Sequence, residues 1–292
     1  AAQRHHVIHC HDFLAQRSAV GEIPQNKVQW TGKKYQQYIR DGYRKGKNFI
    51  SGSYKTREDL HRFLTTKPVR SEVIHNGLNQ KFSPTDVARA RALMSDKTKI
   101  DLSTGYLLHV GGNQWYKNRV GVLELYDAWR SNTEMKQPLL MIGAPPNDEL
   151  LNTKNISSFK DDIHFLTGID DEYVRLAYNG ASLFLFPSLA EGFGWPIAEP
   201  MASGCPTLTT KEAPMSEVAG DAGFLIGRRP YGKTEALTWA KEGALTIDKV
   251  MRMSADERVR AVQAGLVNAR RFDTDNALNK IEKIYKDILR SK

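Results

Sequence analysis

The chain has 292 residues, of which 40% are hydrophobic, and its formal net charge is +9 at pH 7. This length allows one large or two medium domains with a full apolar core, and the absence of an 18-residue apolar run excludes a membrane-spanning helix. The positive charge alone does not decide among nucleic acid, an anionic membrane surface and anionic small molecules as partners.

The first segment with the pattern of a buried strand is Val7–Cys10, which ends in the polar residues His11 and Asp12. Ligands of open α/β sheets lie at such strand ends, so His11 is a candidate ligand contact. The alternative is that His9 and His11 are ordinary loop histidines.

A basic segment rich in tyrosine follows, from Gln29 to Lys47. Its apolar positions recur at helical spacing and predict a helix; they are Tyr35, Tyr38, Ile39 and Tyr43. One interpretation buries this tyrosine stripe under a solvated basic face. A second places the helix on an anionic membrane surface. Stacking on single-stranded nucleic acid is a third, but no nucleic-acid motif accompanies the segment, so we expect no nucleic-acid partner.

Strands and helices then alternate along the chain. Strands are expected at 48–53 and 73–77, with a helix at 55–64 between them. A second run of alternating elements extends from Tyr106 to Leu225. This alternation predicts a doubly wound parallel sheet. Two final helices are expected at 254–272, which starts with a Ser254/Glu257 capping box, and at 274–289.

The loop after the strand Tyr106–Val110 combines Gly111 and Gly112 with two cations, Lys117 and Arg119, just before a helix. A strand, a glycine loop, a cation and a helix start together form a plausible cradle for a diphosphate. The spacing matches neither the dinucleotide-binding fingerprint nor the P-loop, which disfavours a dehydrogenase or an NTPase. The alternative is that both cations are ordinary surface residues at a helix start.

The most informative stretch is 182–204. A hydrophobic strand, a loop and a helix from Pro196 follow one another, and glycines in the loop let a ligand approach the backbone of the helix start. Glu191 precedes Gly192, and Glu199 lies in the helix. Eight helical residues rise about 12 Å, whereas a glycosidase carboxylate pair lies roughly 5–9.5 Å apart. The spacing therefore disfavours a glycosidase; the alternative is two solvent-facing glutamates.

The stretch resembles the Glu-x7-Glu signature of family 4 retaining glycosyltransferases: seven residues separate Glu191 from Glu199, and Gly192-Phe193-Gly194 follows the first glutamate. The resemblance runs from about Val7 to Tyr285. It implies an α/β fold of the GT-B type, with two Rossmann-like domains built on parallel sheets. The implied domains are a partial N-terminal acceptor-side domain at 1–75, a nucleotide-sugar domain at 76–271, and a helix at 272–292 that crosses back.

The resemblance also implies roles for the signature residues. Glu199 would hold the ribose hydroxyls of the nucleotide. Glu191, Gly192 and the backbone amides of Phe193 and Gly194 would orient the donor sugar. The second histidine of the His-x-His-Asp strand end, which is His11 here, would face that sugar.

The glycine loop of the family usually supplies an arginine after the first glycine and a lysine further on. Lys117 matches the lysine, but Gly112 stands at the arginine position beside Gly111, and Arg119 is the candidate replacement. Backbone groups at Thr167 and Ile169 resemble the family's base-binding loop. We expect no metal and no cofactor, because cations and a helix start would stabilise the leaving diphosphate.

The implied activity is a retaining hexosyltransferase that moves a sugar from GDP-mannose or a UDP-hexose to a saccharide or lipid-linked acceptor. The setting expected from the family is bacterial surface polysaccharide or lipopolysaccharide synthesis. Two unpaired cysteines, Cys10 and Cys205, are typical of the reducing cytoplasm, so we expect a cytoplasmic protein, peripheral at the inner face of the plasma membrane.

The chain departs from the family at its start, because members normally carry a further stretch before the His-x-His-Asp strand. A fragment and a naturally reduced N-terminal domain are both open interpretations. Two other functions therefore remain: a non-catalytic nucleotide-sugar binding module, and an adaptor that binds a membrane surface.

Overall fold

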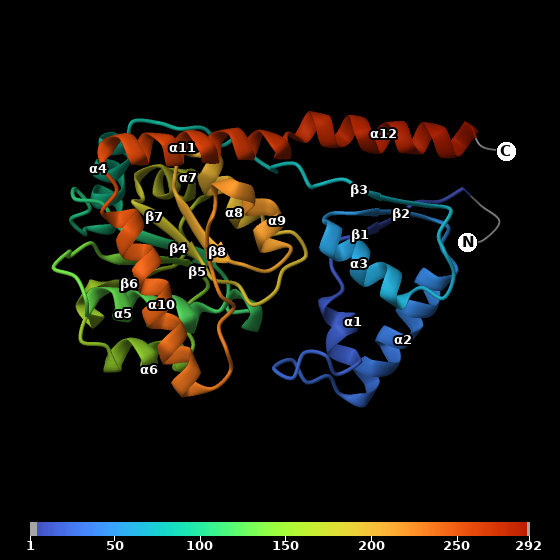
Figure 1. Ribbon diagram of the computed structural model, residues 1–292, viewed down its shortest axis with the longest axis horizontal. Coiled ribbons are helices and arrows are strands. Elements are labelled where there is room, and N and C mark those ends of the chain that lie inside the picture. Colours follow the sequence, from blue (N-terminus) through green and yellow to red (C-terminus); the bar gives the residue numbers. More distant parts are fainter. Residues whose placement is uncertain (1–4, 291–292) are drawn as a thin grey trace. The chain divides into compact units, whose positions relative to one another are not determined.

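Figure 1 shows the computed structural model, which describes residues 5–290. The predicted domains at 1–75 and 272–292 include a few residues that lie outside the described ones, namely 1–4 and 291–292. The chain forms two compact units. Unit 1 contains the residues up to Asn79, the short segment Ala190–Gly194 and the residues from Arg271 onward. Unit 2 contains Gln80–Leu189 and Trp195–Arg270.

Unit 1 is built on a three-stranded parallel sheet in the order β1-β2-β3. The strands are β1 (Ile8–Cys10), β2 (Asn48–Ser51) and β3 (Arg70–Val73). Its helices are α1 (Leu14–Ala19), α2 (Trp30–Arg44), α3 (Tyr54–Phe63) and α12 (Thr274–Arg290). The strand expected at 73–77 is therefore wrong except for Val73. Its apolar pattern belongs to the segment after β3, where Ile74 packs against α12 in the core.

Both faces of this sheet are covered. On one face, Phe13, Phe49, Leu60 and Phe63 pack together with Cys10. On the other face, Ile50 and Ile74 pack against Ile284 and Ile288 of α12. The parallel strands are short and buried on two sides, as parallel sheets normally are, so α12 supplies one layer of the unit 1 core.

The interpretation of α2 as a helix with a buried tyrosine stripe is wrong. Tyr35 is 63% exposed and Tyr38 is 77% exposed, and α2 contains no fully buried residue. At about 100° per residue, Tyr38 and Tyr43 lie roughly 140° apart around the helix. That arc is wider than the face in contact with the unit, so Tyr43 packs on Phe13, whereas Tyr35 and Tyr38 face outward with Trp30.

Unit 2 is an α/β layer structure whose six parallel strands have the order β6-β5-β4-β7-β8-β9. This confirms the predicted fold class of parallel sheets flanked by helices. The strands are β4 (Leu107–Gly111), β5 (Leu139–Gly143), β6 (Ile163–Leu166), β7 (Leu183–Phe186), β8 (Thr207–Thr210) and β9 (Phe224–Ile226).

Helices cover the sheet of unit 2, and Figure 1 shows them around its strands. They are α4 (Val87–Thr98), α5 (Arg119–Arg130), α6 (Asp148–Ile156), α7 (Asp171–Gly180), α8 (Trp195–Ala202), α9 (Met215–Ala219), α10 (Lys233–Met251) and α11 (Ala255–Ala269). Single turns of 3-10 helix lie at η1 (Trp115–Lys117), η2 (Lys160–Asp162), η3 (Gly220–Ala222) and η4 (Arg270–Phe272). The predicted Ser254/Glu257 capping box is present at the start of α11.

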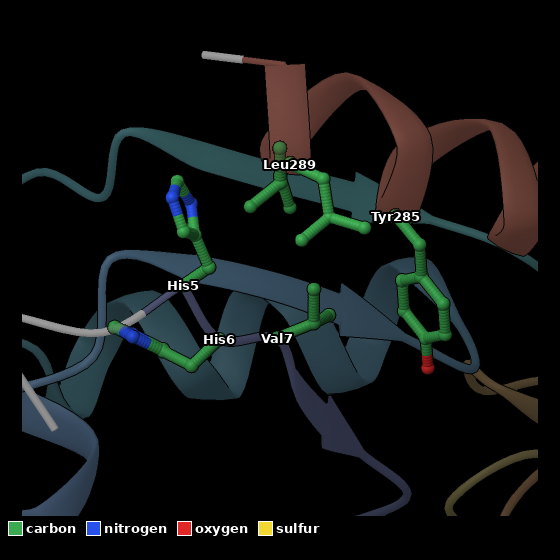
Figure 2. Close-up of a pocket in the computed structure, with 6 residues that line it drawn as sticks. His5, His6, Val7, Tyr285 and Leu289 are labelled. Atoms are coloured by element: carbon green, nitrogen blue, oxygen red, sulfur yellow. The ribbon is translucent and has the colours of Figure 1, made fainter. Parts of the chain in front are cut away.

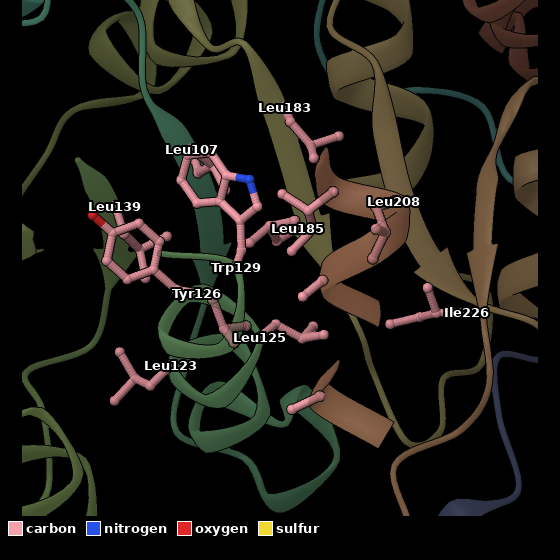
Figure 3. Packing of buried hydrophobic residues seen from close by; sticks show 14 of the residues in the cluster. Leu107, Leu123, Leu125, Tyr126, Trp129, Leu139, Leu183, Leu185, Leu208 and Ile226 are labelled. Atoms are coloured by element: carbon pink, nitrogen blue, oxygen red, sulfur yellow. The ribbon is translucent and has the colours of Figure 1, made fainter. Parts of the chain in front are cut away.

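The main core of unit 2 lies between the sheet and the pair α5 and α10 (Figure 3). Tyr126 and Trp129 of α5 are fully buried there against strand leucines such as Leu107 and Leu183. Helix α10 has 19 residues and was not identified from the sequence. Of its seven buried residues, three are alanine and one is glycine, whereas Leu237 and Leu245 are exposed, so the apolar period is weak.

The contact of α12 with the unit 1 sheet gives a stability prediction. Ile284 is 8% exposed in the core whereas Leu289 of the same helix is 69% exposed. Ile284→Ala removes buried methyl groups and should lower the free energy of unfolding by about 2–5 kcal/mol, measured by urea denaturation. Leu289→Ala is the matched control and should change it by less than about 0.5 kcal/mol. Equal losses in both variants would contradict this packing.

Candidate functional site

The strand order of unit 2 reverses between β4 and β7, which are neighbours although far apart in sequence. In open α/β sheets, ligands bind outside the carboxyl ends of the strands at such a reversal. The loops at this point are the glycine loop after β4 and the segment after β7. The predicted donor-site residues of unit 2 come from these loops, from the loop after β6 and from α8.

The glycine loop fits tightly against the loop after β5. A Cβ on Gly143 would lie 2.0 Å from the carbonyl oxygen of Gly111, and Gly143 has a φ of +145°. A side chain is therefore excluded at Gly143, and the two backbone segments approach each other closely. Gly112 follows, and the side chain of Gln114 packs against it, since a Cβ on Gly112 would lie 2.6 Å from Gln114 Oε1.

Lys117 lies in η1, which is held against the segment after β7. The amide of Leu189 donates to the carbonyl of Tyr116 at 2.8 Å, and Asn118 Nδ2 donates to the carbonyl of Pro187 at 2.8 Å. The Lys117 ammonium lies 5.0 Å from the ring centroid of Phe186. These contacts fix the half-buried Lys117 at the carboxyl end of β7.

Arg119, at the start of α5, is 4% exposed. Its Nη1 donates to the side-chain oxygen of Asn113 and, at 2.9 Å, to the carbonyl of Ala144, while Asn113 Nδ2 donates to the carbonyl of Pro145 at 2.7 Å. Arg119 thus ties the glycine loop to the loop after β5. Its Nε and Nη2 have no partner among the described residues, and burial lowers its pKa.

His109, which was not singled out from the sequence, lies fully buried in β4 below the glycine loop. Its Nδ1 donates to the carbonyl of Leu185 at 2.9 Å, so Nε2 carries a lone pair. Burial lowers the pKa of His109 to about 3, and the ring stays neutral at physiological pH. A Cβ on Gly111 would lie 2.9 Å from Nε2, which is a second reason for glycine in the loop.

Glu199 in α8 is partly buried, and its Oε2 accepts a hydrogen bond of 2.9 Å from the hydroxyl of Tyr178 in α7. Burial raises the pKa of Glu199, and Asp171 adds to this shift, while the Tyr178 hydrogen bond and the charge of Lys117 oppose it. Lys117 and Glu199 are thus electrostatically coupled within unit 2. The sequence did not predict the contact of Tyr178 with Glu199, because it joins two different helices.

The predicted base-binding residues lie in the loop after β6. Thr167 is exposed, Ile169 is partly exposed, and Gly168 between them has a φ of +66°. This left-handed conformation favours glycine and turns the loop away from the strand. Phe165, at the end of β6, packs against the guanidinium of Arg119, 5.6 Å from its ring centroid.

In unit 1, the segment Ala190–Gly194 is fastened to the end of β1. The carbonyl of Gly192 accepts hydrogen bonds from Ser53 Oγ at 2.8 Å and from Thr56 Oγ1 at 3.0 Å. Thr56 Oγ1 also lies 3.3 Å from the carbonyl of His11. A Cβ on Gly192 would lie 2.2 Å from that same carbonyl oxygen, so glycine is required where the segment meets His11.

The rest of this segment is anchored by an aromatic contact and a turn. The ring of Phe193 is buried and lies edge-on to Phe272, with centroids 5.4 Å apart. Gly194 has a φ of +102°. The imidazole of His11 is exposed. Glu191 lies in this loop, so the helical rise used in the sequence argument applies only from Trp195 onward.

A hollow of about 270 Å³ in unit 1 lies away from the predicted residues (Figure 2). It is lined by His5, His6, Val7, Tyr285, Ile288 and Leu289. Within residues 5–290 no group of three or more His, Cys, Asp or Glu side chains has an arrangement that could hold a metal ion. No helix formed by these residues is long and apolar enough to cross a membrane.

The raised pKa of Glu199 gives a pH prediction. The folded protein releases the Glu199 proton at a higher pH than the unfolded chain, whose value is the ordinary 4.5, so the free energy of unfolding falls as pH rises through this interval. Glu199→Gln cannot ionise. Relative to wild type, the variant should therefore gain stability between pH 4 and pH 8, measured by urea denaturation across pH.

Glu242→Gln, which replaces an exposed carboxyl group in α10, is the control and should show no comparable gain. A Glu199→Gln variant that loses stability relative to wild type as pH rises would contradict the assignment of a destabilised carboxylate.

The chain is similar to curated bacterial mannosyltransferases. It is 28% identical to an O-antigen chain mannosyltransferase B of Escherichia coli over 62% of this chain and 46% of that protein. It is 22% identical to the O-antigen chain mannosyltransferase RfbU of Salmonella typhimurium, over the same shares of the two chains. The chain spans about half the length of these relatives.

Solved glycosyltransferases have a similar fold. WaaG, a glycosyltransferase involved in lipopolysaccharide biosynthesis, matches 96% of this chain and 74% of its own, with a TM-score of 0.74 and 18% identity. Anabaena HepE, solved in complex with UDP and glucose, matches 96% of this chain and 72% of its own, with a TM-score of 0.73 and 18% identity.

These likenesses confirm the fold as the GT-B type. The family described as glycosyl transferases group 1 matches residues 91–287, which is more than half of the sequence. The chain belongs to the glycosyl transferases group 1 family.

Proposed function

We propose that the protein transfers a hexose from a nucleoside diphosphate sugar to a hydroxyl of a saccharide or lipid-linked acceptor, with retention of the anomeric configuration. The observation that carries this proposal is the coupling of Lys117 and Glu199 at the reversal of strand order in unit 2. The names of the relatives support mannose as the sugar and bacterial surface polysaccharide as the product.

Unit 2 acts on the nucleotide. Glu199 accepts hydrogen bonds from the ribose hydroxyls, and the backbone at Thr167 and Ile169 contacts the base. Lys117 offsets the negative charge that grows on the leaving diphosphate, which is the kind of electrostatic stabilisation that often dominates catalysis. The backbone of Gly111 and Gly112 contacts the phosphates.

Arg119 supports the diphosphate site in place of an arginine at Gly112. It is held by the carbonyl of Ala144 and by Asn113, and two of its guanidinium nitrogens are buried without partners. Its positive charge is therefore poorly screened by water and acts on an anion bound at the glycine loop.

Unit 1 acts on the sugar. Glu191, Gly192 and the backbone amides of Phe193 and Gly194 orient it, and His11 contacts it. The hydroxyls of Ser53 and Thr56 bind the carbonyl of Gly192, and the Thr56 hydroxyl also binds the carbonyl of His11. The backbones of Gly192 and His11 are therefore held by the same side chains. No metal ion or cofactor is part of the proposal, because Lys117 and Arg119 supply positive charge.

The donor site is tested by thermal unfolding with UDP, GDP or ADP in excess. Ligand at 100 times its dissociation constant adds about 2.7 kcal/mol of stability, which shifts the midpoint by roughly 5 °C or more for a domain of this size. One nucleotide should produce this shift, and GDP is the one that a mannose donor favours. If none of the three shifts a cooperative transition, the proposed donor site is wrong.

Catalysis is tested by cleavage of the donor with water as acceptor, and the anomer released is read by NMR. Lys117→Met should lower the rate of GDP-mannose or UDP-glucose cleavage by about 10²–10³-fold, while GDP or UDP affinity changes less. Lys241→Met, which replaces an exposed lysine of α10, is the control. Nucleotide binding without any cleavage of the donor would favour the alternative of a non-catalytic nucleotide-sugar binding module.

The surface of α2 favours an anionic membrane as an additional partner, with the protein peripheral at the cytoplasmic face. Trp30 is 71% exposed, and the same helix also exposes Tyr35, Tyr38, Lys33 and Lys34. Aromatic rings at the level of lipid headgroups, combined with lysines, are typical of interfacial helices. This arrangement also suits an enzyme whose acceptor is lipid-linked.

Vesicle co-sedimentation tests this surface. Binding to vesicles that contain phosphatidylglycerol should exceed binding to pure phosphatidylcholine, and the combined change Trp30→Ser, Lys33→Gln and Lys34→Gln should weaken it at least tenfold, because each lysine contributes about 1 kcal/mol. The matched control is Leu237→Ser, Lys233→Gln and Lys241→Gln, which replaces one exposed apolar residue and two exposed lysines of α10. Equal loss in both triple variants would remove the special role of α2.

A further inference from the structure

We propose that Tyr178 is a positioning residue for the nucleotide: its hydroxyl holds Oε2 of Glu199, so that Oε1 is presented to the ribose hydroxyls. This inference rests on the proposed function, because it gives a task to the hydrogen bond between α7 and α8. It concerns residues of unit 2 alone.

The geometry fixes the phenol more firmly than the carboxylate. Tyr178 is fully buried, and its ring lies edge-on to Phe184 at 5.4 Å and to Phe82 at 6.1 Å between centroids. Aromatic packing of this kind leaves the ring one orientation. The hydroxyl therefore acts as a fixed donor, and the partly buried carboxylate of Glu199 is the partner whose position it sets.

The carboxylate has few other restraints. Across residues 5–290, Glu199 forms no ion pair and its Oε1 receives no hydrogen bond, and Tyr178 is its hydrogen-bond donor at 2.9 Å. The charged groups that act on it are Lys117, which favours the ionised form, and Asp171, which opposes it. A partly buried carboxylate held by one neutral donor is costly for folding, which points to a role in binding.

The chemistry of the ligand follows from this arrangement. An ionised carboxylate accepts hydrogen bonds and cannot donate, so vicinal hydroxyls such as those of a ribose are suitable donors. Because Tyr178 already occupies one oxygen, the other oxygen is available in a fixed direction. Loss of the Tyr178 hydroxyl should disturb both the direction of Oε1 and the ionisation of Glu199.

The sign of the pH effect can be worked out. Burial raises the pKa of Glu199 and the Tyr178 hydrogen bond lowers it. Nucleotide binding requires the ionised form, so affinity should increase as pH rises through the pKa of Glu199 in the free protein. Tyr178→Phe removes the lowering contribution and should move the midpoint of this increase upward by about one pH unit, since hydrogen bonds to charged groups have this magnitude.

The experiment measures the dissociation constants of GDP and UDP from pH 4.5 to pH 8.5 by calorimetry. Below the new midpoint, Tyr178→Phe should weaken binding roughly tenfold, with a smaller loss at high pH. The matched control is Tyr106→Phe, another fully buried tyrosine whose hydroxyl donates to the carbonyl of Ala177 in α7 at 2.7 Å. It should leave the midpoint unchanged.

Two further variants separate positioning from a structural role. In a Glu199→Gln background, Tyr178→Phe should no longer shift any midpoint, because the group that titrates is absent. Replacement of Tyr178 by 3-fluorotyrosine keeps the size and strengthens the donor, so it should move the midpoint downward. This second variant decides the matter if the Phe variant does not fold.

The outcomes distinguish this inference from the proposed function. If wild type binds neither GDP nor UDP, the proposed nucleotide site itself is wrong. If wild type binds, but the pH profiles of the Tyr178 and Tyr106 variants coincide, Tyr178 has only a structural role and the inference is overturned. A midpoint shift in the Tyr178 variants alone, in opposite directions for Phe and fluorotyrosine, supports it.

Discussion

The reversal of strand order between β4 and β7 is the constraint on which the candidate site of unit 2 depends. All six strands are parallel, so their carboxyl ends lie at one edge, and the loops on the two sides of the reversal diverge there. Gly143 and Gly111 bring two of these loops into backbone contact. Main-chain atoms therefore pack directly against each other at this edge, and a few side chains supply its charge.

The environments of those side chains lower the stability of the folded protein. Arg119 is buried with two unpartnered nitrogens, His109 is kept neutral by burial, and Glu199 has a raised pKa. Each of these states costs folding free energy, since buried charge and unsatisfied polar groups are destabilising. Their concentration at one edge is typical of a ligand site, where an anion and hydroxyl donors would complete the missing interactions.

The sequence predicted what depends on short patterns. Buried strands, glycine loops and the capping box of α11 follow from local periodicity and backbone chemistry, and the alternation of elements predicted the parallel sheets. The sequence did not predict features that depend on tertiary packing. Alanine and glycine make up much of the inward face of α10. The stripe on α2 is wider than the face of that helix in contact with the unit. The hydrogen bond of Tyr178 to Glu199 joins two helices. The predicted roles of the site residues stay predictions, because roles depend on the ligand.

The signature stretch shows why spacing along the chain is a weak guide to geometry. Glu191 belongs by its contacts to unit 1, whereas Glu199 belongs to unit 2. The loop around Glu191 is fastened by Ser53 and Thr56, at the start of α3, and Glu199 is held by Tyr178 of α7. Each carboxylate thus takes its position from residues distant in sequence. The seven residues between them set only a maximum separation, so the position of each carboxylate depends on its own packing and not on the spacing.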